Sequence, residues 1–223
     1  LVVNGARQVG KTYILEQFGK EQFENVVYLN MEIESALNKY FETELSPQKI
    51  IQFAEAAKGQ EIIAGKTLIF FDEIQASERA LTALKYFCEQ TPEYHVVAAG
   101  SLLGVAVNRH KYSYPVGKVD EMTMYPFDFE EFLWAMGKEK LADEIKVHYS
   151  TTEAMPDALH QLALEQYQHY FIVGGMPAAV ASFAETNSFI KAQQIQNNIR
   201  NQYIADMAKY ADPTTSIKVR ACY

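Results

Sequence analysis

Residues 5–12 read Gly5-Ala6-Arg7-Gln8-Val9-Gly10-Lys11-Thr12, which matches the phosphate-loop pattern G-x-x-x-x-G-K-[ST]. The apolar residues 1–3 precede this motif, and residues 13–18 follow it with a pattern that predicts a helix. Glycines allow such a loop to wrap a phosphate group with its backbone N–H groups, and the helix N-terminus adds positive potential. We therefore predict that residues 5–12 and the adjoining Tyr13 bind the phosphates of a nucleotide.

Two side chains at the end of this motif carry more specific predictions. Lys11 is expected to reach the β- and γ-phosphates, and the Thr12 hydroxyl is expected to ligate Mg²⁺. The alternative is a strand–turn–helix in which the Gly-Lys-Thr sequence occurs by chance. The strand before the motif and the helix after it favour the phosphate loop, because the mechanism requires that arrangement.

A second motif lies at residues 68–73, which read Leu-Ile-Phe-Phe-Asp-Glu. Its apolar residues predict a buried strand, with Asp72 and Glu73 at the carboxyl end, where parallel α/β sheets bind their ligands. We predict that Asp72 holds Mg²⁺ through a water and that Glu73 polarises the water that attacks the γ-phosphate. An ordinary strand end is the alternative, and the phosphate loop earlier in the chain favours the catalytic interpretation.

Three further polar residues lie beside expected strands. Ser101 follows the buried strand at residues 95–99 and is a candidate to hydrogen-bond the γ-phosphate or the attacking water. The alternative is that Ser101 only caps the helix that follows. Asn4 and Gln75 adjoin the two main motifs and are candidates for direct contact with the ligand.

Short apolar runs alternate with helical patterns in the first two-thirds of the chain. This alternation predicts parallel strands in a three-layer α/β sheet. The expected strands are residues 1–4, 26–29, 67–71, 95–99 and 118–124. Helices are expected after Ser46-Pro47, with Gly59 as the end, and after Ser77.

The pattern changes after Tyr125 and Pro126. Asp128 and Glu131 form an expected capping box that opens a helix through Trp134. Residues 155–171, 177–184 and 187–210 also have helical patterns, with no convincing strand between them. We therefore predict a phosphate-loop domain over residues 1–140 and an α-helical segment over residues 141–223.

Composition limits the class of protein. The 223 residues carry 20 Lys and Arg against 28 Asp and Glu, a net charge of −8, which gives no basic footprint for nucleic acid. Residues 96–107 form the longest weakly polar run, which is shorter than the roughly 20 residues of a membrane span. Cys88 and Cys222 form no disulfide framework, so we expect a reducing, cytoplasmic location. The five histidines have no metal-ligand spacing.

The two ends of the sequence suggest a piece of a longer protein. Only residues 1–4 precede the first glycine, which is short for a buried strand, and the sequence stops at residue 223 without a turn or polar tail. We therefore expect chain to be missing at both ends.

Several of these motifs together resemble those of prokaryotic AAA-type ATPases of the AAA+ superfamily. The motifs that carry the resemblance are residues 5–12, 71–75, 99–101, 114–118, 125–132, 174–177 and 203–206. The Arg-Gln pair in the loop, the sequence Asp-Glu-Ile-Gln and the pattern Tyr-Pro-x-x-Phe-x-Glu-Phe are the most specific of them. The resemblance covers nearly the whole chain.

The resemblance implies a sheet ordered 5-1-4-3-2, with Ser101 at the sensor-1 position. It also implies a C-terminal nuclease-like region of unknown function, which would lie beyond this chain together with any contact to DNA. The segment before the first strand, which often contacts adenine in such ATPases, is missing here. Lys118 stands where many relatives have arginine.

We expect ATP and Mg²⁺ as ligands, and hydrolysis to ADP and phosphate that serves as a conformational switch. A phosphate-loop kinase and a nucleotide-gated interaction module with negligible turnover are the alternatives. The scarcity of arginines argues against a kinase lid. Arg109 is the candidate for an arginine finger, and a solvated surface charge is its alternative role. The expected partner is a second copy of the chain or another protein, with no membrane contact.

Overall fold

The computed structural model describes residues 1–101 and 117–210, and contacts between Cα atoms divide it into two compact units. Leu1–Ala6 and Gly10–Met124 form the first, and Arg7–Val9 cluster with the chain from Tyr125 onward in the second. This division lies earlier than the boundary expected near residue 140. The reason is packing, because Phe132 lies in one apolar cluster with Val173 and later residues.

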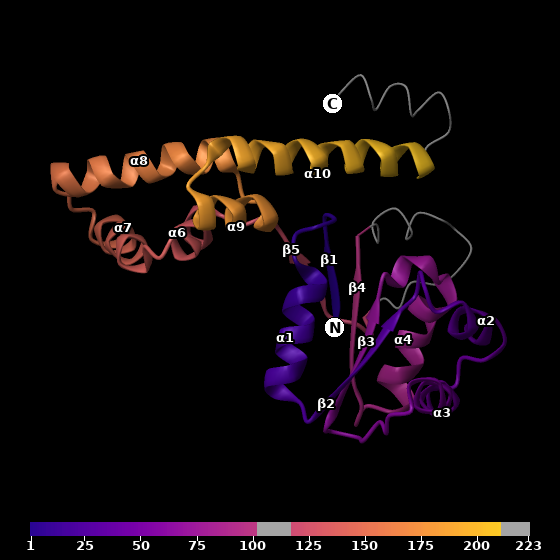
Figure 1. Cartoon of the computed structure of the whole chain (residues 1–223). Coiled ribbons are helices and arrows are strands. Elements are labelled where there is room, and N and C mark those ends of the chain that lie inside the picture. Colours follow the sequence, from indigo (N-terminus) through magenta and orange to yellow (C-terminus); the bar gives the residue numbers. More distant parts are fainter. Residues whose placement is uncertain (102–116, 211–223) are drawn as a thin grey trace. The chain divides into compact units, whose positions relative to one another are not determined.

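A five-stranded parallel sheet forms the centre of the first unit (Figure 1). Its strands are β1 (Val2–Gly5), β2 (Asn25–Asn30), β3 (Thr67–Asp72), β4 (His95–Gly100) and β5 (Glu121–Met124). The order β2-β3-β4-β1-β5, in which every adjacent pair is parallel, confirms the order 5-1-4-3-2. All strands therefore present their carboxyl ends at one edge of the sheet.

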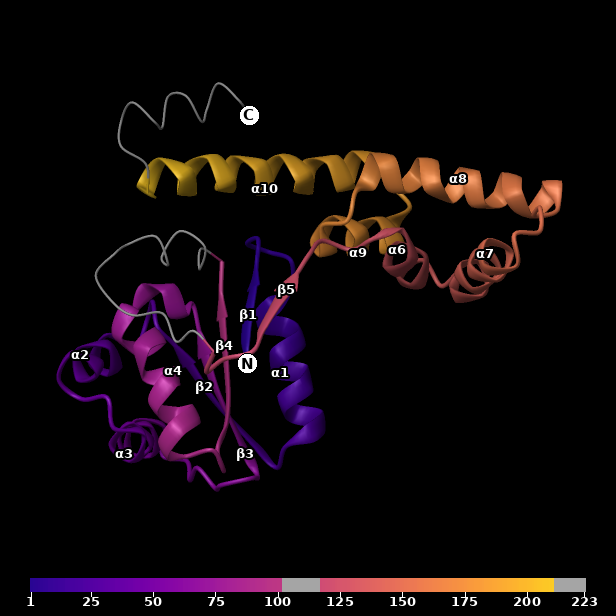
Figure 2. The same cartoon turned by 180° about the vertical axis from the view of Figure 1, so that it is seen from behind.

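Helices cover both faces of the sheet. The helix α1 (Lys11–Gln22) lies on one face, where Leu15 packs with Phe70 and Val97. The other face carries α2 (Ser35–Thr43), α3 (Pro47–Lys58) and α4 (Glu78–Gln90) (Figures 1 and 2). In β1 to β4, successive apolar residues pack alternately into the cluster on one face of the sheet and the cluster on the other, as the two-residue period of a strand requires. The expected three-layer α/β fold is confirmed.

Local sequence signals fix several boundaries in this unit. All six residues of β3 are buried, which explains its unbroken apolar run. The helix α3 ends at Gly59 in the left-handed conformation, and Ser77 caps α4 by accepting a hydrogen bond from the Ala80 backbone N–H. Ser46 occupies the N-cap position of α3 without capping it, because its hydroxyl bonds Gln48 instead. The helix α2 was not expected from the sequence.

The strand β5 begins at Glu121, three residues later than the sequence predicts. Gly117 has a φ of +71°, residues 117–118 form a turn and residue 119 lies in a bend, while the Asp120 carbonyl accepts the Val2 backbone N–H at 2.8 Å. The turn and bend keep residues 117–119 out of the ladder, so the register with β1 begins at Glu121.

The second unit contains only helices among the described residues. They are α6 (Phe129–Ala135), α7 (Glu139–Thr151), α8 (Asp157–Val173), α9 (Pro177–Thr186) and α10 (Phe189–Tyr210). The capping box of Asp128 and Glu131 is present at α6, as expected. The helix α7 was not expected. No helix in the described ranges is long and apolar enough to cross a membrane.

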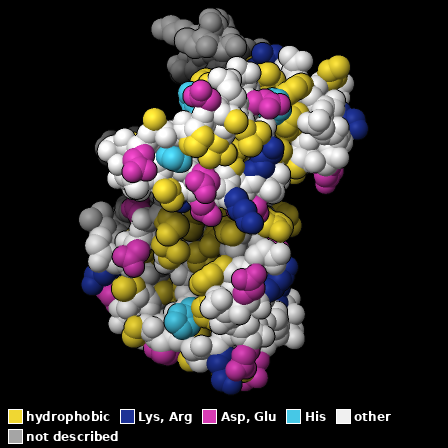
Figure 3. Space-filling view, turned by 90° about the vertical axis from the view of Figure 1, so that its left-hand side faces the viewer, with side chains coloured by type: hydrophobic (Ala, Val, Ile, Leu, Met, Phe, Trp, Pro, Cys, Tyr) yellow, Lys and Arg dark blue, Asp and Glu magenta, His cyan; other side chains and the backbone are white. Residues whose placement is uncertain are grey.

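The surface of the helical unit includes exposed apolar side chains. Figure 3 shows a face of the molecule on which hydrophobic side chains lie among acidic, basic and histidine side chains. Phe171 and Ile172 of α8 and Ile190 of α10 are each more than half exposed. Isolated apolar side chains are normal on protein surfaces, so these residues are not by themselves a binding site.

Candidate functional site

The phosphate-loop motif connects β1 to α1 at the carboxyl edge of the sheet. Gly5 ends β1, and Gly10 is the N-cap of α1 with a φ of +96°. A Cβ atom added to Gly10 would also lie 3.5 Å from the Met124 side chain. Gln8 has a φ of +64°, which is rare for a residue other than glycine. Arg7 and Val9 complete the turn.

Lys11 points back into the loop that precedes it. Its Nζ atom donates hydrogen bonds to the carbonyl oxygens of Gly5, at 3.0 Å, and Ala6, at 2.7 Å. The residue is only 8% exposed, although it carries a charge. The loop therefore holds the ammonium group at the start of α1, beside the position where a helix N-terminus favours an anion.

The two motifs meet through one hydrogen bond. The Thr12 hydroxyl donates to Oδ2 of Asp72 at 2.8 Å, across 60 residues of sequence. The same carboxylate accepts the backbone N–H of Glu73 on Oδ1 at 2.9 Å, and Asp72 is only 4% exposed. The structure thus brings together the two residues that the sequence predicts as the Mg²⁺ site.

Two residues of β2 extend this network, and sequence reasoning missed both. The Tyr28 hydroxyl donates to Oδ2 of Asp72 at 2.9 Å, and Asn30 Nδ2 donates to the Tyr28 oxygen at 3.1 Å. Burial is the main cause that raises the pKa of Tyr28 to about 12, so its phenol keeps its proton at neutral pH. The signal that could have identified these two residues is the order of the strands. Because β2 is parallel to β3 and Asn30 lies opposite Asp72, the end of β2 lies beside the Asp72 carboxylate.

Glu73 follows β3 in an uncommon backbone conformation. Its φ is +50°, in the left-handed region, and such strain in residues other than glycine clusters at functional sites. Its Oε2 atom accepts a hydrogen bond from Gln75 Nε2. Gln75 therefore contacts the expected catalytic carboxylate, while its own buried Oε1 atom has no hydrogen-bond partner within residues 1–101 and 117–210.

Ser101 and Asn4 lie at the ends of adjacent strands. Asn4 stands opposite Gly100 in the parallel β1–β4 register, so Ser101 follows at the same edge as the loop. Asn4 Nδ2 donates to Glu121 Oε2 on β5 at 3.2 Å. Its Oδ1 atom is buried and has no hydrogen-bond partner among the residues that the structure describes.

The donor atoms in the network fit a magnesium ion. Mg²⁺ prefers hard oxygen ligands and commonly takes one or two protein oxygens together with substrate phosphates and water. The Thr12 hydroxyl and the Asp72 carboxylate are such oxygens, and they lie within hydrogen-bond distance of each other. No group of three or more His, Cys, Asp or Glu with metal-binding geometry occurs within residues 1–101 and 117–210. Arg109 and Cys222 lie outside the described residues.

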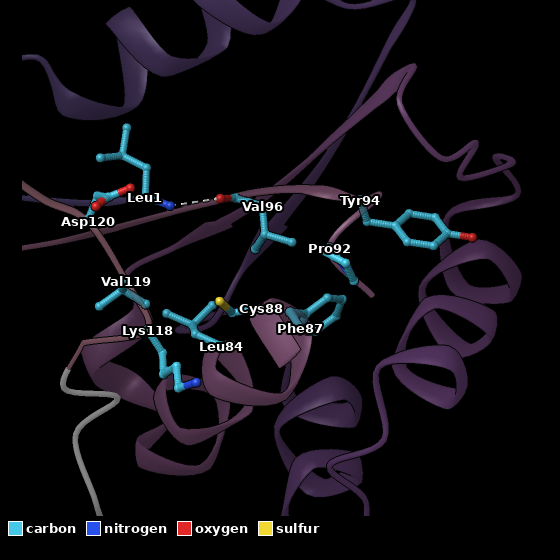
Figure 4. Close-up of a pocket in the computed structure, with 10 residues that line it drawn as sticks. All are labelled: Leu1, Leu84, Phe87, Cys88, Pro92, Tyr94, Val96, Lys118, Val119 and Asp120. Atoms are coloured by element: carbon cyan, nitrogen blue, oxygen red, sulfur yellow. Dashed lines mark hydrogen bonds between the residues drawn. The ribbon is translucent and has the colours of Figure 1, made fainter. Parts of the chain in front are cut away.

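A cavity of about 240 Å³ lies elsewhere in the first unit (Figure 4). It is lined at the amino ends of three strands by Leu1, Val96 and Asp120, together with residues of α4 such as Phe87 and Cys88. Ligand pockets usually measure roughly 300–1,000 Å³. The cavity is small by that measure, and it lies at the opposite edge of the sheet from Lys11 and Asp72.

Two family models match parts of the chain. The model of a family described as an AAA domain matches residues 1–133. A second model, that of a domain of unknown function, matches residues 164–223. No curated protein matches the chain.

Solved structures that match part of the chain include C. elegans PCH-2 and the Aeropyrum pernix ORC2 protein. For PCH-2 the TM-score is 0.38 at 12% identity, over 70% of this chain and 41% of that one. For ORC2, solved as ADPNP–ADP complexes, the TM-score is 0.41 at 11% identity, over 74% of this chain. The chain spans 41% and 61% of the lengths of these two proteins.

Proposed function

Because the chain belongs to the AAA domain family, we propose that it binds ATP with Mg²⁺ and hydrolyses it to ADP and phosphate. In this proposal the nucleotide state acts as a conformational switch. Family membership supports a nucleotide-binding ATPase function in general terms. The observation that carries the more specific proposal is the 2.8 Å contact between Thr12 and Asp72, which joins a hydroxyl and a carboxylate suited to Mg²⁺.

The phosphate loop has the role of an anion site in this proposal. Its backbone N–H groups and the N-terminus of α1 bind phosphate oxygens. Lys11 exchanges its contacts with the Gly5 and Ala6 carbonyls for contacts with the β- and γ-phosphates. Thr12 would ligate Mg²⁺ and Asp72 would hold it through a water, and the ion would neutralise phosphate charge.

Glu73 is the proposed general base. Its carboxylate polarises the attacking water, and Ser101 hydrogen-bonds the γ-phosphate or that water. Gln75 donates a hydrogen bond to the Glu73 carboxylate, which supports a role in orienting it. A nucleotide-gated module with negligible turnover and a kinase use the same binding residues, so they are outcomes of the test below.

Two isosteric variants test the hydrolase proposal. Glu73→Gln retains size and hydrogen bonding but removes the carboxylate, so nucleotide affinity should persist while turnover falls about 10²–10⁴-fold. Asp72→Asn places an amide where three donors converge on a carboxylate, so both Mg²⁺-dependent binding and turnover should fall. Glu93→Gln is the matched control, because Glu93 is exposed after α4.

Free phosphate and ADP should be measured side by side for the parent and these variants. Equal phosphate release by the parent and Glu73→Gln, above background, would remove Glu73 as the base. A parent that binds nucleotide without turnover would support the gated module. ADP formation without matching phosphate, in the presence of an acceptor, would support the kinase.

We also propose a cytoplasmic location and a protein partner, either a second copy or another chain. We further propose that the phosphate-loop domain extends to about residue 140 and that the protein contacts DNA. Sedimentation of the full-length protein with and without ATP would test the partner proposal.

A further inference from the structure

The carboxylate of Asp72 is held by more groups than the phosphate-loop motifs supply. Its Oδ2 atom accepts two hydroxyl hydrogen bonds, from Thr12 at 2.8 Å and from Tyr28 at 2.9 Å. Its Oδ1 atom accepts the backbone N–H of Glu73. Thr12 and Glu73 belong to the two motifs, whereas Tyr28 lies 44 residues before Asp72 on β2.

The direction of the Tyr28 hydrogen bond is fixed by its neighbour. Asn30 Oδ1 accepts the backbone N–H of Glu32 at 2.9 Å, which orients the amide so that Nδ2 faces Tyr28. An amide NH₂ can only donate, so the Tyr28 oxygen is the acceptor from Asn30. The single phenolic proton of Tyr28 is then directed to Asp72, and the chain of donors ends on the carboxylate.

The position of the Tyr28 ring is fixed separately from its hydroxyl. The ring packs edge-to-face against Phe70 of β3, with the centroids 5.3 Å apart. It also packs against the apolar cluster under α1. Removal of the hydroxyl alone should therefore leave the ring in place, which allows the hydrogen bond to be tested separately from the packing.

We infer that Tyr28 is a positioning residue for the Mg²⁺ site, oriented by Asn30 and acting through Asp72. The inference rests on the proposed nucleotide-binding function. By fixing Oδ2, Tyr28 keeps the acceptor of the Thr12 proton in place, so that the lone pairs of the Thr12 oxygen would remain available to ligate Mg²⁺. Groups of this kind, which bond a ligand or its partner rather than the metal, commonly change metal affinity about 10–100-fold.

The test compares Tyr28→Phe with the parent, and Tyr40→Phe is the matched control. Tyr40 is a half-buried tyrosine of the same unit whose ring stacks on Phe53 of α3, away from Asp72. ADP affinity is measured by calorimetry in excess MgCl₂ and again in EDTA, and the ratio of the two dissociation constants reports the metal's contribution. Binding of Mn²⁺ in the presence of ADP, followed by electron paramagnetic resonance, gives a second readout.

Tyr28→Phe should lower the metal's contribution about tenfold or more, while affinity in EDTA stays within about twofold of the parent. Asn30→Ala should also lower the metal's contribution to ADP affinity, by a smaller factor, because Tyr28 keeps its hydroxyl but loses the hydrogen bond from Asn30 that orients it. This second variant keeps the inference testable if Tyr28→Phe does not fold. Tyr40→Phe should leave both dissociation constants unchanged.

Two results would overturn the inference, and they differ from failure of the proposed function. A metal contribution in Tyr28→Phe within about twofold of the parent would exclude the positioning role. An equal loss of affinity with and without the metal would indicate a purely structural role. Absence of ADP binding by the parent would instead overturn the proposed function, and the inference with it.

Discussion

Substitution of Lys11 by alanine should separate nucleotide binding from folding. Two hydrogen bonds to the Gly5 and Ala6 carbonyls stabilise the buried ammonium, each by about 1.5 kcal/mol or more for a charged donor. Desolvation opposes this gain. The positive charge of Lys11 at the N-terminus of α1 also lowers the stability of the fold by about 0.3–1 kcal/mol, because it is repelled by the helix dipole.

The net effect of Lys11→Ala on the free energy of unfolding should therefore be a loss of about 2 kcal/mol or less. For a chain of this size that corresponds to a decrease in Tm of roughly 4–8 °C at most, so the fold should persist. The lost contacts to phosphate should weaken ATP binding about 100-fold or more, which corresponds to about 2.7 kcal/mol. Calorimetry with Mg-ATP and thermal unfolding measure the two effects.

Lys20→Ala is the control in the same helix. Lys20 lies in the last turn of α1, 64% exposed, with its Nζ atom 3.6 Å from Glu16 Oε2. A surface ion pair of this kind contributes at most about 1 kcal/mol, so Lys20→Ala should bind ATP like the parent. If Lys11→Ala bound Mg-ATP as tightly as the parent, or if both variants lost binding equally, the phosphate-loop assignment would be wrong.

Two further predictions concern single contacts. Thr12→Val removes the hydroxyl that bonds Asp72, so it should weaken ADP binding about tenfold or more in MgCl₂ and change it little in EDTA. Thr12→Ser retains a hydroxyl and should bind ADP in MgCl₂ like the parent. Equal ADP affinity of the two variants in a titration would contradict this prediction. Gly175→Ala should destabilise the helical unit by about 3 kcal/mol or more, because the new Cβ would lie 2.0 Å from the Phe127 carbonyl oxygen. An unchanged melting curve by circular dichroism would contradict this prediction.

The sequence by itself predicted the fold and the two main motifs, because both depend on local patterns. The fixed spacing of the glycines before Lys11 indicates a phosphate loop. The unbroken apolar run before Asp72 indicates a strand that is buried on both faces of the sheet. The sheet order followed from the resemblance to a known family and is confirmed. The roles of Lys11, Thr12, Asp72, Glu73 and Ser101 stay predictions.

Tertiary structure alone decided which other residues meet at the site. Tyr28 and Asn30 look like ordinary strand residues in sequence, and only the parallel register of β2 beside β3 brings them to Asp72. The division at Met124 was likewise decided by packing, since α6 buries Phe132 among later helices. Both depend on contacts between residues far apart in the chain, and such contacts leave no periodic signal in the sequence.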